Sequence, residues 1–118
     1  MSSAEIKSKI EALKIALEDF IRQVNNILLK YQDFDSKIES INSLISDSQD
    51  TSMIQGISTA NDAISKTISS LIRQIESEKA IVISNVNKKI DDYEALLRNA
   101  LAKEERQRQE LMKKNSNT

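Results

Sequence analysis

Acidic side chains are the residues of this chain whose grouping could support metal binding or acid–base chemistry. The sequence has no His and no Cys, which leaves out imidazole bases, thiolate nucleophiles, disulfides and the usual zinc sites. The acidic groups are Glu18-Asp19, Asp33 with Asp35, and Asp91-Asp92-Glu94. Di-metal sites inside helical bundles combine Glu with His, so we interpret these acids as solvent-exposed helix faces. We therefore expect no catalytic residues, no metal ligands and no cofactor.

The composition indicates an interaction protein made of a few long helices. The 118 residues include one Gly and no Pro, too few for the turns of a sheet. The net charge of −1 gives no reason to expect nucleic acid as a partner. Residues 1–5 do not begin a basic and then apolar signal segment, and no apolar run approaches the roughly 20 residues of a membrane span. We expect a cytoplasmic protein without a membrane span, with secretion together with a partner as the alternative.

The first half of the chain carries a regular heptad repeat. Apolar residues recur in steps of four and three at Ile6, Ile10, Leu13, Leu17, Phe20, Val24, Ile27, Tyr31, Phe34, Ile38, Ile41 and Ile45. Such a period keeps one seam of a helix against a partner helix. Ser2 and Glu5 fit a capping box, and a polar stretch follows Ile45. The pattern predicts a helix over about 3–46 and a turn over about 47–51.

The second half carries a longer apolar stripe with a slightly different period. Its members are Ile57, Ala60, Ile64, Ile68, Leu71, Ile75, Lys79, Val82, Val86, Ile90, Tyr93 and Leu97. The mean spacing of about 3.6 residues is typical of a straight helix rather than a supercoiled one. Lys79 either sets the register as a polar seam residue or extends beside the seam to water. The stripe predicts a second helix over about 52–112, followed by disorder over 113–118.

Together the two stripes predict an all-α fold. Two long antiparallel helices form a coiled-coil-like helical hairpin, with the second helix longer than the first, in a single domain over 1–112. The alternative is one uninterrupted helix that dimerises in parallel, but a change of period at a polar stretch favours two elements. The basic segment 98–114 then extends beyond the first helix, either as a solvated overhang or as a recognition extension.

Several aliphatic residues of the first helix fall outside its predicted seam. Ile15 and Leu29 are placed on the opposite face, and Ile21 and Leu28 beside the seam. A lone pair of helices buries only one stripe of each, which suggests that helices of another chain complete the fold. We therefore predict that Ile15, Ile21, Leu28 and Leu29 bind a partner protein by helix packing, although isolated surface aliphatics are also common. A homo-oligomer is a further option.

Two short motifs accompany the hairpin pattern. Ile54-Gln55-Gly56, with the only Gly of the chain, follows the turn, and Asp35 stands four residues after Tyr31. Residues 3–100 resemble the WXG/ESAT-like small proteins of Gram-positive type VII secretion, which carry Trp-x-Gly near the turn and a Tyr-x-x-x-Asp/Glu export motif after the second helix. Here Ile54 replaces the Trp, and the Tyr31 motif lies in the first helix. The chain is therefore more similar to the small targeting partners of LXG-domain toxins.

The resemblance implies a non-catalytic chaperone or targeting factor. Such a factor binds the helical amino-terminal domain of a secreted LXG-type toxin, together with a second small helical protein, and Ile54 and Gly56 would be its turn motif. The residues alone leave two alternatives, a structural coiled-coil scaffold or tether and a small helical regulator or inhibitor. A scaffold requires self-association and leaves Ile15 and Leu29 inessential.

Overall fold

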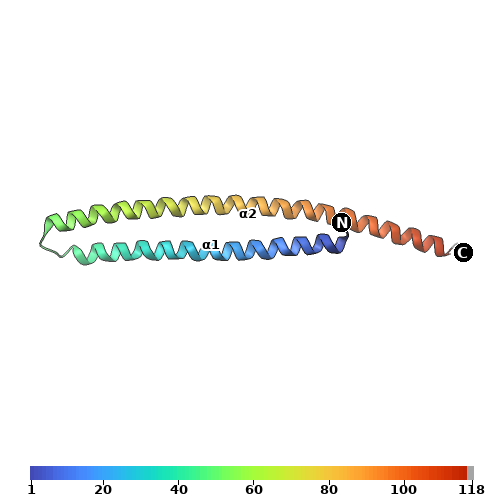
Figure 1. Cartoon of the computed structure of the whole chain (residues 1–118), viewed down its shortest axis with the longest axis horizontal. Coiled ribbons are helices and arrows are strands. Elements are labelled where there is room, and N and C mark those ends of the chain that lie inside the picture. The colour runs from blue at the N-terminus through green and yellow to red at the C-terminus, as the bar shows by residue number, and fades with distance from the viewer. Residues whose placement is uncertain (117–118) are drawn as a thin grey trace. The chain divides into compact units, whose positions relative to one another are not determined.

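The chain folds into two long antiparallel helices that form a helical hairpin, as the sequence predicts. A computed structural model describes residues 1–116 and contains α1 (Ser3–Ile45) and α2 (Thr51–Ser116), with no strand among those residues (Figure 1). α2 is the longer helix, and it begins one residue before the predicted start. The alternative of one uninterrupted helix is wrong, because residues 46–50 are not helical.

Short polar side chains close the turn between the helices. The backbone N–H of Ser48 donates to the carbonyl oxygen of Ile45 at 3.0 Å. The carboxylate of Asp50 accepts a hydrogen bond from the backbone N–H of Met53 at 3.0 Å and so caps the first turn of α2. At the start of α1, the Ser2 hydroxyl accepts from the Glu5 N–H at 3.2 Å. The turn is thus built without Gly or Pro.

α2 continues further than predicted. We expected disorder over 113–118, but the helix extends to Ser116, and residues 117–118 lie outside the described part of the chain. Lys113 and Lys114 occupy the last helical turn, where a positive charge interacts favourably with the helix dipole. Adding a turn to an existing helix also avoids the cost of nucleation. The prediction of disorder is therefore wrong for residues 113–116.

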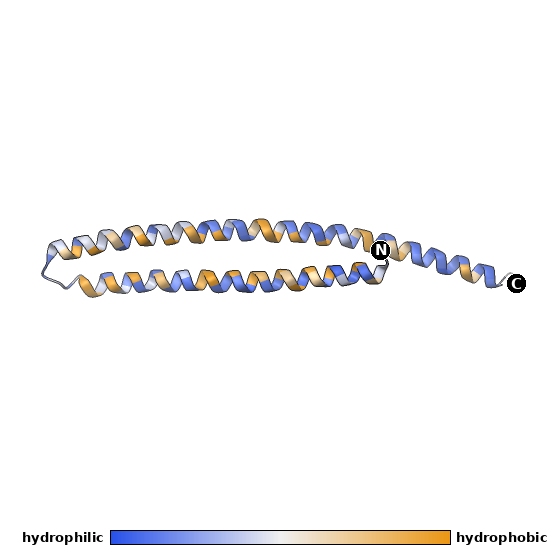
Figure 2. Ribbon diagram, in the orientation of Figure 1, coloured by the Kyte–Doolittle hydropathy of each residue, from blue (hydrophilic) through white to orange (hydrophobic). Residues whose placement is uncertain are grey.

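Both helices are amphipathic along their length. Hydrophobic and hydrophilic residues alternate around each ribbon (Figure 2). Within residues 1–116, neither helix holds an apolar stretch of the length that crosses a membrane. Amphipathic helices of this kind pack their apolar side against other parts of a protein.

The contacts group the chain into two compact units, which we describe separately. The terminal unit comprises Met1–Asp19 and Val82–Thr118, of which residues up to 116 are described, and the central unit is Phe20–Ile81. That residues 1–112 form a single domain stays a prediction. Each unit contains a segment of α1 and an antiparallel segment of α2.

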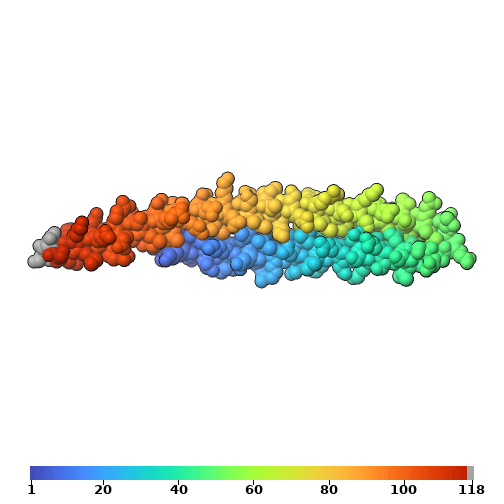
Figure 3. Space-filling view, turned by 180° about the vertical axis from the view of Figure 1, so that it is seen from behind, coloured from blue at the N-terminus to red at the C-terminus, as the bar shows by residue number. Residues whose placement is uncertain are grey.

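The terminal unit has a small apolar core with polar contacts at its edge. Ile6, Ile10 and Ile90 are buried, and Leu97 packs against them. Near the start of α1, the backbone N–H and the hydroxyl of Ser3 both donate to the Glu104 carboxylate, at 3.1 and 2.8 Å. Beyond this contact, α2 residues 105–116 extend past the end of α1 (Figure 3).

The contact between Ser3 and Glu104 makes the end of α1 sensitive to pH. The pKa of Glu104 lies below its ordinary value, first because the Ser3 hydroxyl donates to the carboxylate and then because the Ser3 N–H does so; Arg108 and Lys7 add smaller effects. A carboxyl group whose pKa falls on folding stabilises the folded state above its unfolded pKa. That contribution is lost as the pH falls through the folded pKa.

We expect Glu104→Gln to weaken hydrogen-exchange protection of the first amides of α1 at neutral pH. The difference from the unmodified protein should shrink as the pH falls through the folded pKa of Glu104, which the Ser3 hydrogen bonds hold below its ordinary value, because Glu104 itself then becomes neutral. Glu105→Gln is the matched control, because Glu105 pairs with Arg108 on α2 itself, at 2.9 Å. A difference that persists unchanged at low pH would show that the charge of Glu104 does not hold α1 in place.

The central unit joins its helices through both apolar and polar contacts. Leu28, Ile38 and Ile68 are its buried apolar residues. Three hydrogen bonds cross between the helices: Asn61 to Asn42 at 2.7 Å, Ser65 to Asp35 at 2.7 Å, and Lys79 to Asn25 at 2.8 Å. Lys79 thus makes a polar contact across the pair of helices. This seam therefore contains more polar side chains than a seam built from an Ile and Leu heptad repeat would contain.

One of the two rows that form the seam of the central unit is shifted by one residue position from the prediction, whereas the other row, which includes Ile38 and Ile68, is buried as predicted. On α1, the residues turned toward α2 are Leu28, Asp35 and Asn42 rather than Ile27, Phe34 and Ile41. On α2, they are Asn61, Ser65 and Ile72 rather than Ala60, Ile64 and Leu71. The predicted seam is wrong at these positions.

The shift follows from the period of an unsupercoiled helix. A strict heptad repeat holds one face toward a partner only when the helices supercoil, and it drifts by about 20° per heptad in a straight helix. In the terminal unit, Ile6 and Ile10 are buried as predicted. Three heptads after the level of Ile6, the drift reaches about 60°, and the residue after the predicted one, Leu28, is buried instead.

Candidate partner-binding face

The four residues predicted to bind a partner have different environments. Ile15 and Leu29 are exposed, at 58% and 61% of their surface, and so are available to a partner. Ile21 is half-buried. Leu28 is only 7% exposed and belongs to the seam of the central unit, so its assignment to a partner-binding surface is wrong. Ile15 lies in the terminal unit and Leu29 in the central one, and the structure does not bring them together in one unit.

A row of apolar side chains is exposed on α1 in the central unit. Ile27 is 46% exposed and Phe34 is 52% exposed, and Ile41 is similarly open. The three residues are seven positions apart, so they follow one side of the helix. Each stands one position before a residue that faces α2. The row therefore borders the seam along one edge.

A second row lies at the equivalent positions of α2. Ile64 and Leu71 are exposed, and Ile57, seven residues earlier, is half-buried. These residues also stand one position before inward-facing ones, as Ile64 does before Ser65. The axes of two antiparallel helices define a plane, and a two-fold rotation about a line perpendicular to this plane exchanges the helices. The rotation leaves residues above the plane above it and residues below the plane below it. Equivalent positions of the two helices therefore lie on the same side.

The two rows form one surface, which we call the central apolar face. Its members are Ile27, Phe34, Ile41, Ile57, Ile64 and Leu71. The opposite side of the pair is bordered by the residues that directly follow Val24, Tyr31 and Ile38 on α1 and Ile54, Asn61, Ile68 and Ile75 on α2. These border residues are polar: Asn25, Gln32, Glu39, Gln55, Asp62, Ser69 and Glu76. Further out, Leu29, Leu44, Met53 and Ile81 are also exposed, but they do not form a row along the seam. The seam therefore has an apolar border on one side and a polar border on the other, and an exposed apolar border is typical of a surface that packs against another element.

The two edges of the central apolar face differ in charge. Lys30 and Lys37 lie three residues after Ile27 and Phe34, on the outer edge of the α1 row. Lys37 also pairs with Asp33 at 3.0 Å along α1, and both side chains are exposed. The equivalent positions beside the α2 row hold Ala60, Thr67 and Gln74, which carry no charge. The face therefore has one basic edge and one uncharged edge.

The predicted turn motif lies inside the first turns of α2. Ile54 is half-buried, whereas Gly56 is exposed and helical. A Cβ atom added to Gly56 would meet nothing within 4 Å, and no Gly in the described chain has a positive φ. Neither backbone conformation nor packing within the chain requires Gly at this position.

Gly56→Ala should therefore stabilise the isolated protein. Ala restricts the unfolded chain more than Gly does and favours the helix by about 0.5–1 kcal/mol, which corresponds to a few degrees in melting temperature. Thermal unfolding followed by circular dichroism measures the change. Ala63→Gly, at another exposed position of α2, should shift the melting temperature in the opposite direction. A lower melting temperature for Gly56→Ala would show that Gly56 makes a contact that the helix does not account for.

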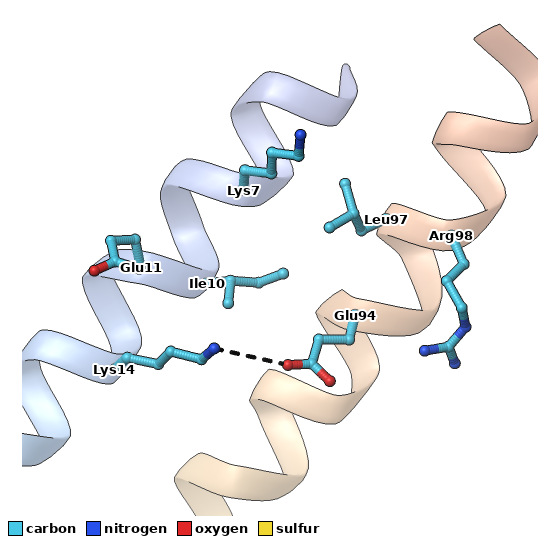
Figure 4. Close-up of a pocket in the computed structure, with 7 residues that line it drawn as sticks. All are labelled: Lys7, Ile10, Glu11, Lys14, Glu94, Leu97 and Arg98. Atoms are coloured by element: carbon cyan, nitrogen blue, oxygen red, sulfur yellow. Dashed lines mark ion pairs between the residues drawn. The ribbon is translucent and has the colours of Figure 1, made fainter. Parts of the chain in front are cut away.

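The terminal unit also carries a shallow recess between its two helical segments. It has a volume of about 480 Å³ and is lined mainly by charged side chains, with Lys14 and Glu94 4.0 Å apart across it (Figure 4). Its acidic residues, Glu11 and Glu94, lie on different helices (Figure 4). Within residues 1–116, no three acidic side chains come close enough together to hold a metal ion. The recess is a charged surface groove between two helices.

Comparisons with known proteins identify no relative of this chain. No family model, no curated protein and no solved structure matches it. The spacing of the apolar residues predicts that the members of the central apolar face lie in the seam. In the structure, the residues that directly follow them on α1 lie in the seam instead. These following residues are Leu28, Asp35 and Asn42, and the sequence gives no apolar repeat at their positions.

Proposed function

We propose that this chain is a non-catalytic helical partner protein that binds helices of another polypeptide through the central apolar face. The observation that carries the proposal is the row of exposed large apolar residues along the same border of the seam on both helices of the central unit. Exposed rows such as Ile27, Phe34 and Ile41 are unfavourable in water and gain free energy when another helix covers them. The two rows of α1 and α2 together offer an apolar surface of the kind on which an amphipathic helix packs.

The resemblance to small partners of LXG-domain toxins supports a narrower proposal. In it, the covering helices belong to the helical amino-terminal domain of an LXG-type toxin, and this chain acts as its chaperone or targeting factor for type VII secretion. A chaperone of this kind would cover apolar surface of the toxin domain until export. The basis for this step is the hairpin with Ile54-Gln55-Gly56 after its turn.

Co-expression with the amino-terminal domain of an LXG-type toxin tests the proposal. The unmodified chain should co-purify with that domain, and the double variant Phe34→Ser and Ile64→Ser should fold but fail to co-purify. The control is Leu96→Ser with Leu111→Ser, which removes two exposed leucines of the terminal unit and should co-purify normally.

A third variant, Ile15→Lys with Leu29→Lys, tests the surface predicted from the sequence. If this variant loses the toxin domain while Phe34→Ser with Ile64→Ser retains it, the binding surface is the outer face of α1. If the unmodified chain does not co-purify with the toxin domain, the narrower proposal is wrong.

A further inference from the structure

The length and the charge of the central apolar face restrict what can bind there. Ile27 to Ile41 spans fourteen residues on α1, and Ile57 to Leu71 spans the same number on α2. At about 1.5 Å per residue, each row is about 21 Å long, or about four helical turns. An occupant that covers both rows is therefore a helix with three or more heptads of apolar residues.

The basic edge adds a requirement for charge. Lys30 forms no ion pair with any carboxylate of residues 1–116, and the pair between Lys37 and Asp33 is an exposed contact along one helix. Exposed pairs of this kind are weak and exchange readily for a better partner. A helix packed on the central apolar face would bring its flanking side chains against Lys30 and Lys37. Acidic residues at those flanking positions would be attracted, and basic ones repelled.

A second copy of this chain is a poor match for the same edge. Two copies packed face to face would bring Lys30 and Lys37 either against the same lysines or against Thr67 and Gln74. Among the helical acids of the central unit, Glu39, Asp62 and Glu76 lie on the polar side. Asp35 accepts a hydrogen bond from Ser65 in the seam, and Asp33 already pairs with Lys37. A second copy therefore brings only Glu78, seven residues after Leu71, to the face as complementary charge. The charge pattern therefore favours a different polypeptide.

We infer that the central apolar face binds one amphipathic helix of another polypeptide, with acidic residues along the flank that lies over α1. This inference rests on the proposed function and adds the charge and the orientation of the bound helix. The flank over α2 meets Ala60, Thr67 and Gln74 and requires no charge. The two edges thus fix which side of the bound helix faces α1.

Two synthetic peptides provide the test with the full chain. Both have three heptads with Leu at the apolar positions; the acidic peptide has Glu at the flanking positions, and the basic peptide has Lys there. Fluorescence anisotropy of the labelled peptides gives the affinities. We expect the acidic peptide to bind about tenfold more tightly than the basic one, with a smaller difference at high salt. Phe34→Ser with Ile64→Ser should abolish binding of both.

Charge-reversed variants show which lysines cause the preference for the acidic peptide. Lys30→Glu with Lys37→Glu should reverse the order of the two peptides. Lys66→Glu with Arg73→Glu changes the net charge equally, at exposed positions of α2 away from the face, and should preserve the original order. Circular dichroism of each variant confirms that it is helical.

Several results would overturn the inference. These are equal affinities for the two peptides, binding of neither, or loss of the preference in both charge-reversed variants. Sedimentation that shows a dimer, converted to monomer by Phe34→Ser with Ile64→Ser, would assign the face to a second copy instead. If the peptides behave as expected but the toxin domain does not co-purify, only the narrower proposed function fails. If the toxin domain co-purifies and the peptides show no charge preference, only this inference fails.

Discussion

Leu28→Asp is expected to unfold the central unit, whereas Ile27→Asp and Leu29→Asp are expected to leave it folded. The three residues are consecutive, but their environments differ sharply. Leu28 is only 7% exposed, while Ile27 is 46% exposed and Leu29 is 61% exposed. A carboxylate at position 28 would be placed in the apolar seam without a partner. Loss of the buried Leu and burial of an unpaired charge together cost about 3–5 kcal/mol.

A loss of this size is large for a pair of helices. Folded domains are stable by about 5–15 kcal/mol, and small ones lie near the lower limit. The described residues contain only six buried apolar side chains, of which Leu28 is one. Circular dichroism at 25 °C should therefore show a marked loss of helix for Leu28→Asp. The two neighbouring variants should retain their helix content and melt within a few degrees of the unmodified protein, since a surface change costs about 0.5 kcal/mol or less.

The same three variants distinguish the structure from the seam predicted by spacing. In that seam Ile27 is central, and Ile27→Asp would be the damaging change. Unfolding by Ile27→Asp together with a stable Leu28→Asp would contradict the phase of α1 described here. Urea unfolding of all three variants gives the comparison in free energy.

The fold itself could be predicted because its determinants are local. The absence of Pro and the single Gly leave few positions for turns, and two apolar periods meet at one polar stretch. Ser2 at the start of α1 and Asp50 at the start of α2 then set the helix ends through hydrogen bonds to residues three positions away. Such signals are readable within a short window of sequence.

The phase of the helices could not be predicted in the same way. Ile27 and Leu28 are both large and aliphatic, and a shift of one position exchanges them. Which one is buried depends on how far the two helices supercoil, and a repeat in one helix does not determine this. The apolar period of α1 is typical of a supercoiled helix, whereas the period of α2 is typical of a straight one. Two helices that share one seam cannot follow both geometries, so the periods alone do not decide which residues are buried.

The polar contacts of the seam depend on pairing between distant residues. Asn42 and Asn61 each look like ordinary surface residues in the sequence, and only the register of the hairpin brings them together. The contact between Ser3 and Glu104 joins residues 101 positions apart. The central apolar face escaped prediction for the same reason, because its members become exposed only when the polar residues beside them turn inward.

Replacing Asn42 and Asn61 together by Leu is expected to stabilise the hairpin. The two amides hydrogen-bond to each other at 2.7 Å and are half-buried between the helices. A hydrogen bond contributes only about 1 kcal/mol net, because both groups give up hydrogen bonds to water. Two leucines in contact at the same level would bury apolar surface worth a further 1–3 kcal/mol or so.

The single variants should behave differently from the double variant. Asn42→Leu or Asn61→Leu alone leaves one amide half-buried without its partner, so each should be neutral or destabilising by about 1 kcal/mol. The double variant should be more stable than the unmodified protein by about 1–2 kcal/mol, a rise of several degrees in melting temperature. A double-mutant cycle of the four proteins, followed by thermal unfolding, isolates the coupling between the two positions.

The sign of that coupling depends on which residues form the seam. If Ile41 and Ile64 faced inward, positions 42 and 61 would lie at the border of the pair, and two added leucines would be exposed to water. The cycle would then show no coupling and no stabilisation. A stabilising coupling places Asn42 and Asn61 between the helices and so leaves Ile41 and Ile64 outside, on the face proposed to bind a partner. The same unfolding experiment therefore tests both the packing of the central unit and the availability of its apolar face.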